Sequence, residues 1–156
     1  MKRPYLLIIT VTMWFVFTGG ISLSEDFNVE SIEAYRQAAE KNPHDAKSYF
    51  NLGIACLKSG MYQESIESLK QAIKIVPDDA EAHKALGYVC LNLYLYEDAI
   101  EASKQVLRIK PDATAHYNLG YIYNASDDKD SALKQYEILK SLDSELANKL
   151  LKLINK

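Results

Sequence analysis

The chain holds few of the residues that build most catalytic centres. Its 156 residues include two cysteines, three histidines and one tryptophan. There is no Cys-x-x-Cys-His haem motif, and no cysteine or histidine spacing is typical of a zinc site. A Ser/His/Asp or Cys/His grouping, paired catalytic carboxylates and a phosphate-holding glycine loop are also missing. The sequence therefore predicts a protein that is not an enzyme and that binds no cofactor or metal.

Long basic runs are missing as well. The 18 lysines and arginines are outnumbered by 21 aspartates and glutamates, which gives a net charge of −3 at pH 7. A surface that binds nucleic acid is basic, because it has to neutralise phosphates. We therefore expect no nucleic-acid partner. Apolar residues make up 48% of the chain and charged residues 25%, as in ordinary folded domains.

The first 24 residues differ from the rest of the chain. Lys2 and Arg3 are the only charges before Glu25, and an apolar stretch follows them over residues 5–17. Glycines and serines then lead to the first acidic residue. A basic start, a short apolar run and an exit of small residues predict a secretory signal in residues 1–24.

An uncleaved membrane anchor is the alternative interpretation of this segment. Residues 5–23 carry no charge, and roughly 20 apolar residues are needed to span a bilayer. In that case residues 4–24 would be the part of the chain that contacts the membrane. Under both interpretations the basic end stays in the cytoplasm. The remainder is expected to be extracytoplasmic, either periplasmic or secreted.

The prolines and glycines that the chain does have follow a fixed period. Pro43, Pro77 and Pro111 are 34 residues apart, and Leu-Gly pairs recur in step with them. The pairs are Leu52-Gly53, Leu86-Gly87 and Leu119-Gly120. A period of this length is typical of a solenoid, in which each unit covers the apolar face of its neighbour.

Each period contains two helical patterns. In the first unit, apolar residues at helical spacing predict helices over residues 46–58 and 62–75, with a turn at Ser59-Gly60. The matching predictions are residues 80–92 and 96–109 in the second unit, and residues 113–125 and 129–142 in the third.

These units resemble the tetratricopeptide repeat, a helix–turn–helix unit of 34 residues with the pattern W-x₂-L-G-x₂-Y…A-x₃-F…P. The first halves read Tyr49-x₂-Leu52-Gly53-x₂-Cys56, His83-x₂-Leu86-Gly87-x₂-Cys90 and His116-x₂-Leu119-Gly120-x₂-Tyr123. The second halves read Ser65-x₃-Leu69, Ala99-x₃-Ser103 and Ala132-x₃-Tyr136. Departures gather in the third unit, where Ser144 replaces the family's proline and the turn lacks glycine.

The resemblance covers about residues 30 to 144 and implies an all-α, right-handed α-solenoid. Its three repeats would be residues 46–79, 80–112 and 113–143. A half-repeat helix within residues 25–45 would precede them, packing through Ser31, Tyr35 and Ala38. Residues 144–156 would form a capping helix, because an open end of a solenoid would leave apolar surface exposed.

The resemblance also implies a concave groove, lined by the first helix of each unit, that takes an extended peptide or a helix from a partner. The groove residues of this sequence would be Lys47, Phe50, Asn51, Ile54 and Leu57 in the first unit, Lys84, Tyr88 and Leu91 in the second, and Tyr117, Asn118, Tyr121 and Asn124 in the third. Lys58, Glu81 and Asn92 would flank them. Alternatively, some of these side chains pack against neighbouring helices, or the terminal helices fold over them.

Three smaller groups of residues have a structural interpretation. Cys56 and Cys90 occupy matching places in successive units, where buried thiols are favoured over a disulfide. His83 and His116 replace bulky core residues of the family, which predicts packing. The acidic run at Asp128 lacks the spacing of a calcium loop and is expected to cap a helix.

The function predicted from the sequence is an exported, non-catalytic protein-interaction module. It would act as an adaptor or scaffold that binds a partner peptide or helix in the groove. The alternative is a structural subunit or assembly factor of an envelope or secretion complex, acting through its convex face or by self-association.

Overall fold

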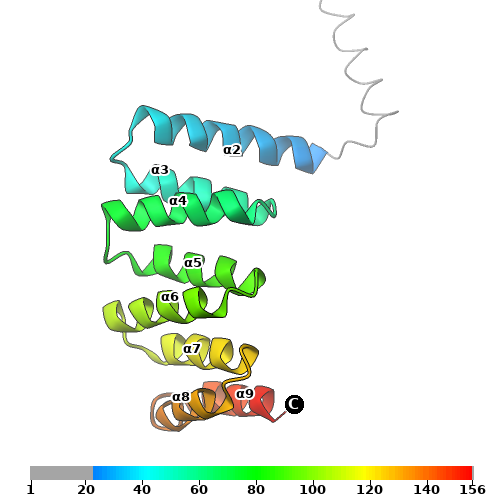
Figure 1. Ribbon diagram of the computed structural model, residues 1–156, viewed down its shortest axis with the longest axis vertical. Coiled ribbons are helices and arrows are strands. Elements are labelled where there is room, and N and C mark those ends of the chain that lie inside the picture. Colours follow the sequence, from blue (N-terminus) through cyan, green and yellow to red (C-terminus); the bar gives the residue numbers. More distant parts are fainter. Residues whose placement is uncertain (1–22, 156) are drawn as a thin grey trace, which may run out of the picture.

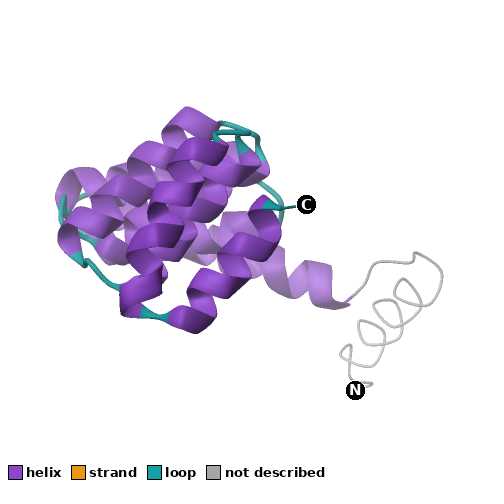
Figure 2. Cartoon of the chain, turned by 90° about the horizontal axis from the view of Figure 1, so that it is seen from below, coloured by secondary structure: helices purple, strands orange, loops and turns teal. Residues whose placement is uncertain are grey.

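The computed structural model describes residues 23–155 of the chain, and every regular element within that range is an α-helix. The helices are α2 (Leu23–Lys41), α3 (Ala46–Lys58), α4 (Tyr62–Ile75), α5 (Ala80–Asn92), α6 (Tyr96–Ile109), α7 (Ala113–Ala125), α8 (Lys129–Leu142) and α9 (Ser144–Ile154). They stack in chain order, with α2 at one end and α9 at the other (Figure 1). Short loops connect neighbouring helices, as the view from below shows (Figure 2).

The three central helix pairs, α3–α4, α5–α6 and α7–α8, begin and end at the predicted residues. One reason is an aspartate shortly after each periodic proline. Asp45, Asp79 and Asp112 are the N-caps of α3, α5 and α7, and each carboxylate accepts a hydrogen bond from a backbone N–H of the first turn. An N-cap of this kind satisfies a donor that the helix itself leaves unpaired.

The turn inside each pair uses a left-handed residue. Gly60, Tyr94 and Asp127 occupy this place in the three units, with φ angles of 73°, 58° and 64°. Glycine adopts this conformation without steric cost and aspartate tolerates it, but a tyrosine there is strained. The left-handed turn of the second unit is therefore maintained against the preference of its own residue.

Close packing explains the glycine in the first and third units. A Cβ atom added at Gly53 would lie 2.7 Å from Leu69 Cγ of the paired helix, and Ser65 Oγ donates a 2.7 Å hydrogen bond to the Gly53 carbonyl. A Cβ at Gly120 would lie 2.5 Å from Leu150 Cδ2 of α9. The nearest atom to a Cβ at Gly87 would be Ser103 Oγ, at 3.4 Å, so the second pair packs less tightly at this point.

The two terminal helices differ from the prediction to different extents. Helix α9 begins at the predicted residue and buries Leu150 and Ile154 against the third unit. Helix α2 begins at Leu23, which lies inside the segment predicted to be a signal. No glycine or proline follows Leu23 before Pro43, so nothing in the sequence requires a later start.

The packing face of α2 is also rotated from the one predicted. Among residues 31–41, whose side chains the structure describes, Ile32 and Ala39 are buried and the predicted Ser31 and Ala38 are half-buried, whereas Tyr35 is 37% exposed. Ile32 packs with Leu52 and Cys56 of α3 in a small apolar cluster. The prediction for Tyr35 was wrong because α2 has only one neighbouring helix pair, so the repeat pattern does not fix its rotation.

Most of the segment predicted to be a signal or an anchor, residues 1–24, lies outside the described residues. Within residues 23–155, no helix is both long enough and apolar enough to span a bilayer.

Candidate functional site

A groove of about 830 Å³ runs along the first helices of the three repeats. Nine of the twelve predicted groove residues line it: Phe50, Ile54 and Leu57 from α3, Lys84, Tyr88 and Leu91 from α5, and Tyr117, Asn118 and Tyr121 from α7. Lys47, Asn51 and Asn124 are not in the lining. The structure therefore brings together the apolar and aromatic part of the predicted set, and leaves out three polar side chains.

The groove also has a wall that the repeat pattern does not predict. Tyr94 comes from the turn of the second unit, and Tyr96, Ser103 and Val106 come from α6, the second helix of that unit. Gly87 lies in the lining as well. Gly87 is itself buried, and a Cβ added there would lie 3.4 Å from Ser103 Oγ of α6, so α5 and α6 are in close contact at this part of the wall.

Burial separates the floor of the groove from its rim. Phe50, Ile54, Leu57 and Leu91 are partly buried and pack against the central core cluster. For these four residues the alternative interpretation, packing against neighbouring helices, holds in part. Tyr88 is 58% exposed and Tyr121 is 41% exposed, so their rings are accessible at the rim.

Tyr88 and Tyr121 occupy equivalent positions of successive repeats. Each directly follows the glycine of its Leu-Gly pair, and Ile54 has the same place in the first unit. In the part of the wall formed by the second turn and α6, the rings of Tyr94 and Tyr96 contact edge to face, with centroids 6.2 Å apart and planes at 75°. Edge-to-face contact is a favoured geometry for an aromatic pair. It holds the exposed Tyr94 ring beside the groove.

The charged side chains of the lining neutralise one another. They are Glu81 and Lys84, which form an ion pair one helical turn apart on α5. The remaining polar side chains of the rim are the amides of Asn92 and Asn118 and the tyrosine hydroxyls. The groove thus offers aromatic faces and neutral hydrogen-bonding groups.

The other candidate residues have structural roles. Cys56 and Cys90 are free buried thiols, and burial raises the pKa of both, that of Cys56 to about 11. They therefore stay protonated and unreactive at neutral pH. The Asp128 carboxylate accepts a 3.0 Å hydrogen bond from the Ser131 N–H and caps α8, as predicted.

One histidine joins its helix to a loop, and the other joins two helices. His83 Nε2 lies 2.9 Å from the Pro77 carbonyl oxygen, and His116 Nδ1 lies 2.8 Å from Gln135 Oε1 of α8. Each ring nitrogen in these contacts is the donor, because a carbonyl oxygen only accepts. Within the described part of the chain, no group of three His, Cys, Asp or Glu residues is arranged to hold a metal ion.

Comparison with protein-family models finds the same repeat along most of this stack. A model described as "TPR repeat" matches residues 55–93, and two described as "Tetratricopeptide repeat" match residues 34–67 and 95–145. No curated protein matches the sequence.

Several solved structures are similar. MamA from Desulfovibrio magneticus is 19% identical, with a TM-score of 0.67 over 98% of this chain and 96% of that one. TTC0263, a thermophilic TPR protein in Thermus thermophilus, is 20% identical, with a TM-score of 0.66 over 86% and 76%. YrrB, described as a TPR protein with an unusual peptide-binding site, is 21% identical, with a TM-score of 0.61 over 72% and 59%. The likeness confirms the predicted all-α, right-handed α-solenoid.

Proposed function

The chain belongs to the tetratricopeptide repeat family, and we propose that it is a non-catalytic interaction module that binds a partner peptide or helix in its groove. The observation that carries the proposal is the exposed pair Tyr88 and Tyr121 above an apolar floor. Tyrosine is enriched at protein interfaces because it brings a large contact area, few rotatable bonds and a hydroxyl group.

The extent of the groove supports a segment of a protein as the ligand. Its volume is about 830 Å³, and residues from the first helices of three successive units line it. An elongated, open site suits a chain that continues past both ends. YrrB, which shares the fold, is described as having a peptide-binding site, and this supports the same class of ligand here.

We also propose that the module acts outside the cytoplasm. The basis is the sequence of the first 24 residues, where Lys2 and Arg3 precede an uncharged apolar stretch. Mass spectrometry of the protein recovered from its own host would test this. A chain that starts near Glu25 would support a cleaved signal, an intact chain in the membrane fraction would support an anchor, and an intact chain in the cytoplasm would contradict export.

Affinity capture tests the binding function. The full chain with a C-terminal tag would be compared with a Tyr88→Ala/Tyr121→Ala variant, using an envelope extract. A matched control is Leu133→Ala/Leu142→Ala, which removes two exposed apolar side chains from α8, outside the groove lining. Circular dichroism would check that all three proteins keep the same helical content.

The expected result is a partner that the wild type and the α8 variant retain and the tyrosine variant loses. A partner retained by the tyrosine variant would contradict binding in the groove. If that partner were lost from the α8 variant instead, the contact would lie away from the groove, as the alternative of a structural subunit requires.

A further inference from the structure

We propose that the groove binds a proline-rich segment of another protein in the polyproline II conformation. This inference rests on the proposed function and specifies the chemistry of its ligand. The evidence is the charge of the lining, its aromatic content, its unused hydrogen-bonding groups and the strained backbone at Tyr94.

The charge of the lining points to an uncharged ligand. Glu81 and Lys84 pair with each other, and the lining contains no other Asp, Glu, Lys or Arg. An acidic or basic segment buried here would lose its hydration without gaining a free counter-charge, which is costly. A segment without charged side chains avoids this cost.

The aromatic content favours an extended, proline-rich segment over a helix. Six of the lining residues are aromatic: Phe50, Tyr88, Tyr94, Tyr96, Tyr117 and Tyr121. Grooves lined by aromatic rings are the known docking sites of polyproline II segments, because proline rings pack flat against them. Between the described residues, Tyr94 and Tyr96 form the one aromatic pair, so the faces of Tyr88 and Tyr121 are free of other rings.

Unused donors on the rim match the backbone of such a segment. Within the described residues, the side chains of Tyr88, Tyr121 and Asn118 form no hydrogen bond. A proline-rich segment has no N–H at its prolines, and its carbonyl groups are free because the polyproline II helix has no internal hydrogen bonds. The tyrosine hydroxyls and the Asn118 amide can therefore donate to these carbonyls.

The strained turn of the second unit supports a binding role for Tyr94. Its φ of 58° is costly for a bulky residue, and the first unit has Gly60 at the equivalent place. The tyrosine is 76% exposed, so burial in the core does not compensate for this cost. Its ring contacts Tyr96 and lines the groove. Contact between this ring and a ligand would explain why a tyrosine occupies the strained position.

These 156 residues do not themselves supply such a ligand. Their four prolines stand singly at positions 4, 43, 77 and 111, so no segment among them is rich in proline.

The test is calorimetric titration of the full-length protein with three blocked, uncharged peptides. They are decaproline, a flexible glycine–serine peptide of the same length, and an alanine–leucine–glutamine peptide of about 18 residues, which is long enough to form a helix in water. Decaproline should bind saturably and the other two should not. In Tyr88→Ala/Tyr121→Ala the affinity for decaproline should fall at least about tenfold, as expected when aromatic anchors of an interface are truncated.

A second variant separates binding from folding. Tyr94→Gly removes a groove ring and also relieves the left-handed backbone, so its melting temperature should be unchanged or higher while its affinity falls. Asp127→Gly is the matched control, because Asp127 has the same left-handed conformation in the third unit and does not line the groove. Its affinity for decaproline should be unchanged.

Other outcomes overturn the inference in distinguishable ways. Binding of the helical peptide without decaproline would refute the proline-rich ligand and leave the proposed function intact. Equal binding of decaproline by the wild type and the tyrosine variants would refute the location. If no peptide binds, the inference is wrong, and the capture experiment decides whether the groove still binds a protein.

Discussion

The two ends of the solenoid are closed in different ways. Helix α9 packs on both α7 and α8, and it places Ala147, Leu150 and Ile154 in one apolar cluster with Ala132 and Leu139. Helix α2 packs on α3, and from its residues 31–41 Ile32 joins an apolar cluster with Leu52, Ala55 and Cys56 of α3. Over these residues α2 buries fewer apolar side chains than α9 does.

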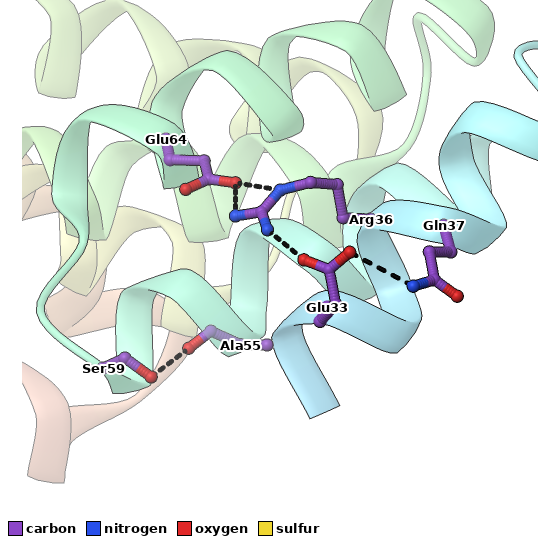
Figure 3. A network of polar contacts seen from close by, with 6 residues as sticks. All are labelled: Glu33, Arg36, Gln37, Ala55, Ser59 and Glu64. Atoms are coloured by element: carbon purple, nitrogen blue, oxygen red, sulfur yellow. Dashed lines mark hydrogen bonds and ion pairs between the residues drawn. The ribbon is translucent and has the colours of Figure 1, made fainter. Parts of the chain in front are cut away.

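Polar contacts supplement the N-terminal end. Arg36 of α2 donates two hydrogen bonds to Glu64 Oε1 of α4, at 3.2 Å from Nε and 2.7 Å from Nη2. Its third contact, from Nη1, is to Glu33 one turn earlier, and Glu33 also accepts from Gln37 (Figure 3). Ion pairs near the surface contribute far less than buried apolar area does. We therefore expect α9 to unfold together with the core. Helix α2, which is held in part by a surface ion pair, is expected to unfold locally at a lower free energy.

The largest effect is expected from Leu150→Ala. Leu150 is fully buried, so its truncation should lower the free energy of unfolding by about 2–5 kcal/mol. Chemical denaturation measures the change, and hydrogen exchange should show that protection falls in α9 and in α7 and α8 together. Loss confined to α9 would show that the cap is not part of the core. Leu142→Ala, at a 55% exposed position of α8, is the matched control and should change stability little.

A smaller effect of the same origin is expected from Gly120→Ala. The added Cβ would lie 2.5 Å from Leu150 Cδ2 and 3.0 Å from Gln135 Cβ, so the buried Leu150 side chain or α9 has to shift, at a cost of about 1–3 kcal/mol. Gly87→Ala is the matched control. The added Cβ would lie 3.4 Å from Ser103 Oγ, and within a helix alanine is more stable than glycine by about 0.5–1 kcal/mol. This variant should therefore lose little stability. Equal losses in both variants would contradict the packing described at α9.

At the N-terminal end, Arg36→Ala should cost about 0.5–1 kcal/mol, since both partners of the Arg36–Glu64 pair are partly exposed to solvent. The loss should appear as faster hydrogen exchange in α2, with α9 unaffected. Arg108→Ala removes an ion pair to Asp78 whose partners are 58% and 72% exposed, and it should leave exchange unchanged. Slower exchange in α9 than in α2 is expected in all three proteins, and the reverse order would contradict the comparison.

The smallest effect is a pH dependence confined to α2. Hydrogen bonds from Gln37 and then from Arg36 hold the pKa of Glu33 below its ordinary value of 4.5. A lowered pKa means that the carboxylate stabilises the folded state above pH 4.5, and that this contribution is lost as the pH falls through the lowered value. NMR amide shifts of α2 should report this step. Glu33→Gln should remove it, and a step that persists in this variant would belong to another group.

Much of the fold could be predicted from the sequence because the repeat leaves little choice. The 34-residue period and helical spacing gave the bounds of the six central helices, since each begins after a cap or turn that the period repeats. The rotation and start of α2 could not be predicted in this way. A half-repeat has no preceding unit, so its packing face depends on which residues of α3 are left uncovered.

For the candidate site, the repeat register located the first-helix face, and nine of the twelve predicted residues line the groove. The repeat pattern does not predict which residues of the turns and second helices also line the groove. Tyr94, Tyr96 and Val106 were missed because they belong to a turn and a second helix, which the repeat pattern assigns to packing. Lys47, Asn51 and Asn124 lie on predicted helices, but outside the hollow that the neighbouring units leave.

The sequence by itself determined the helices, their order and their pairing, because the spacing of apolar residues, caps and glycines acts locally and repeats. The tertiary structure alone decided the shape of the groove and the strength of the two ends. These depend on contacts between residues far apart in the chain. A Cβ at Gly87 would meet Ser103 at an ordinary contact distance, whereas Gly120 packs tightly against Leu150 because α9 folds back onto α7.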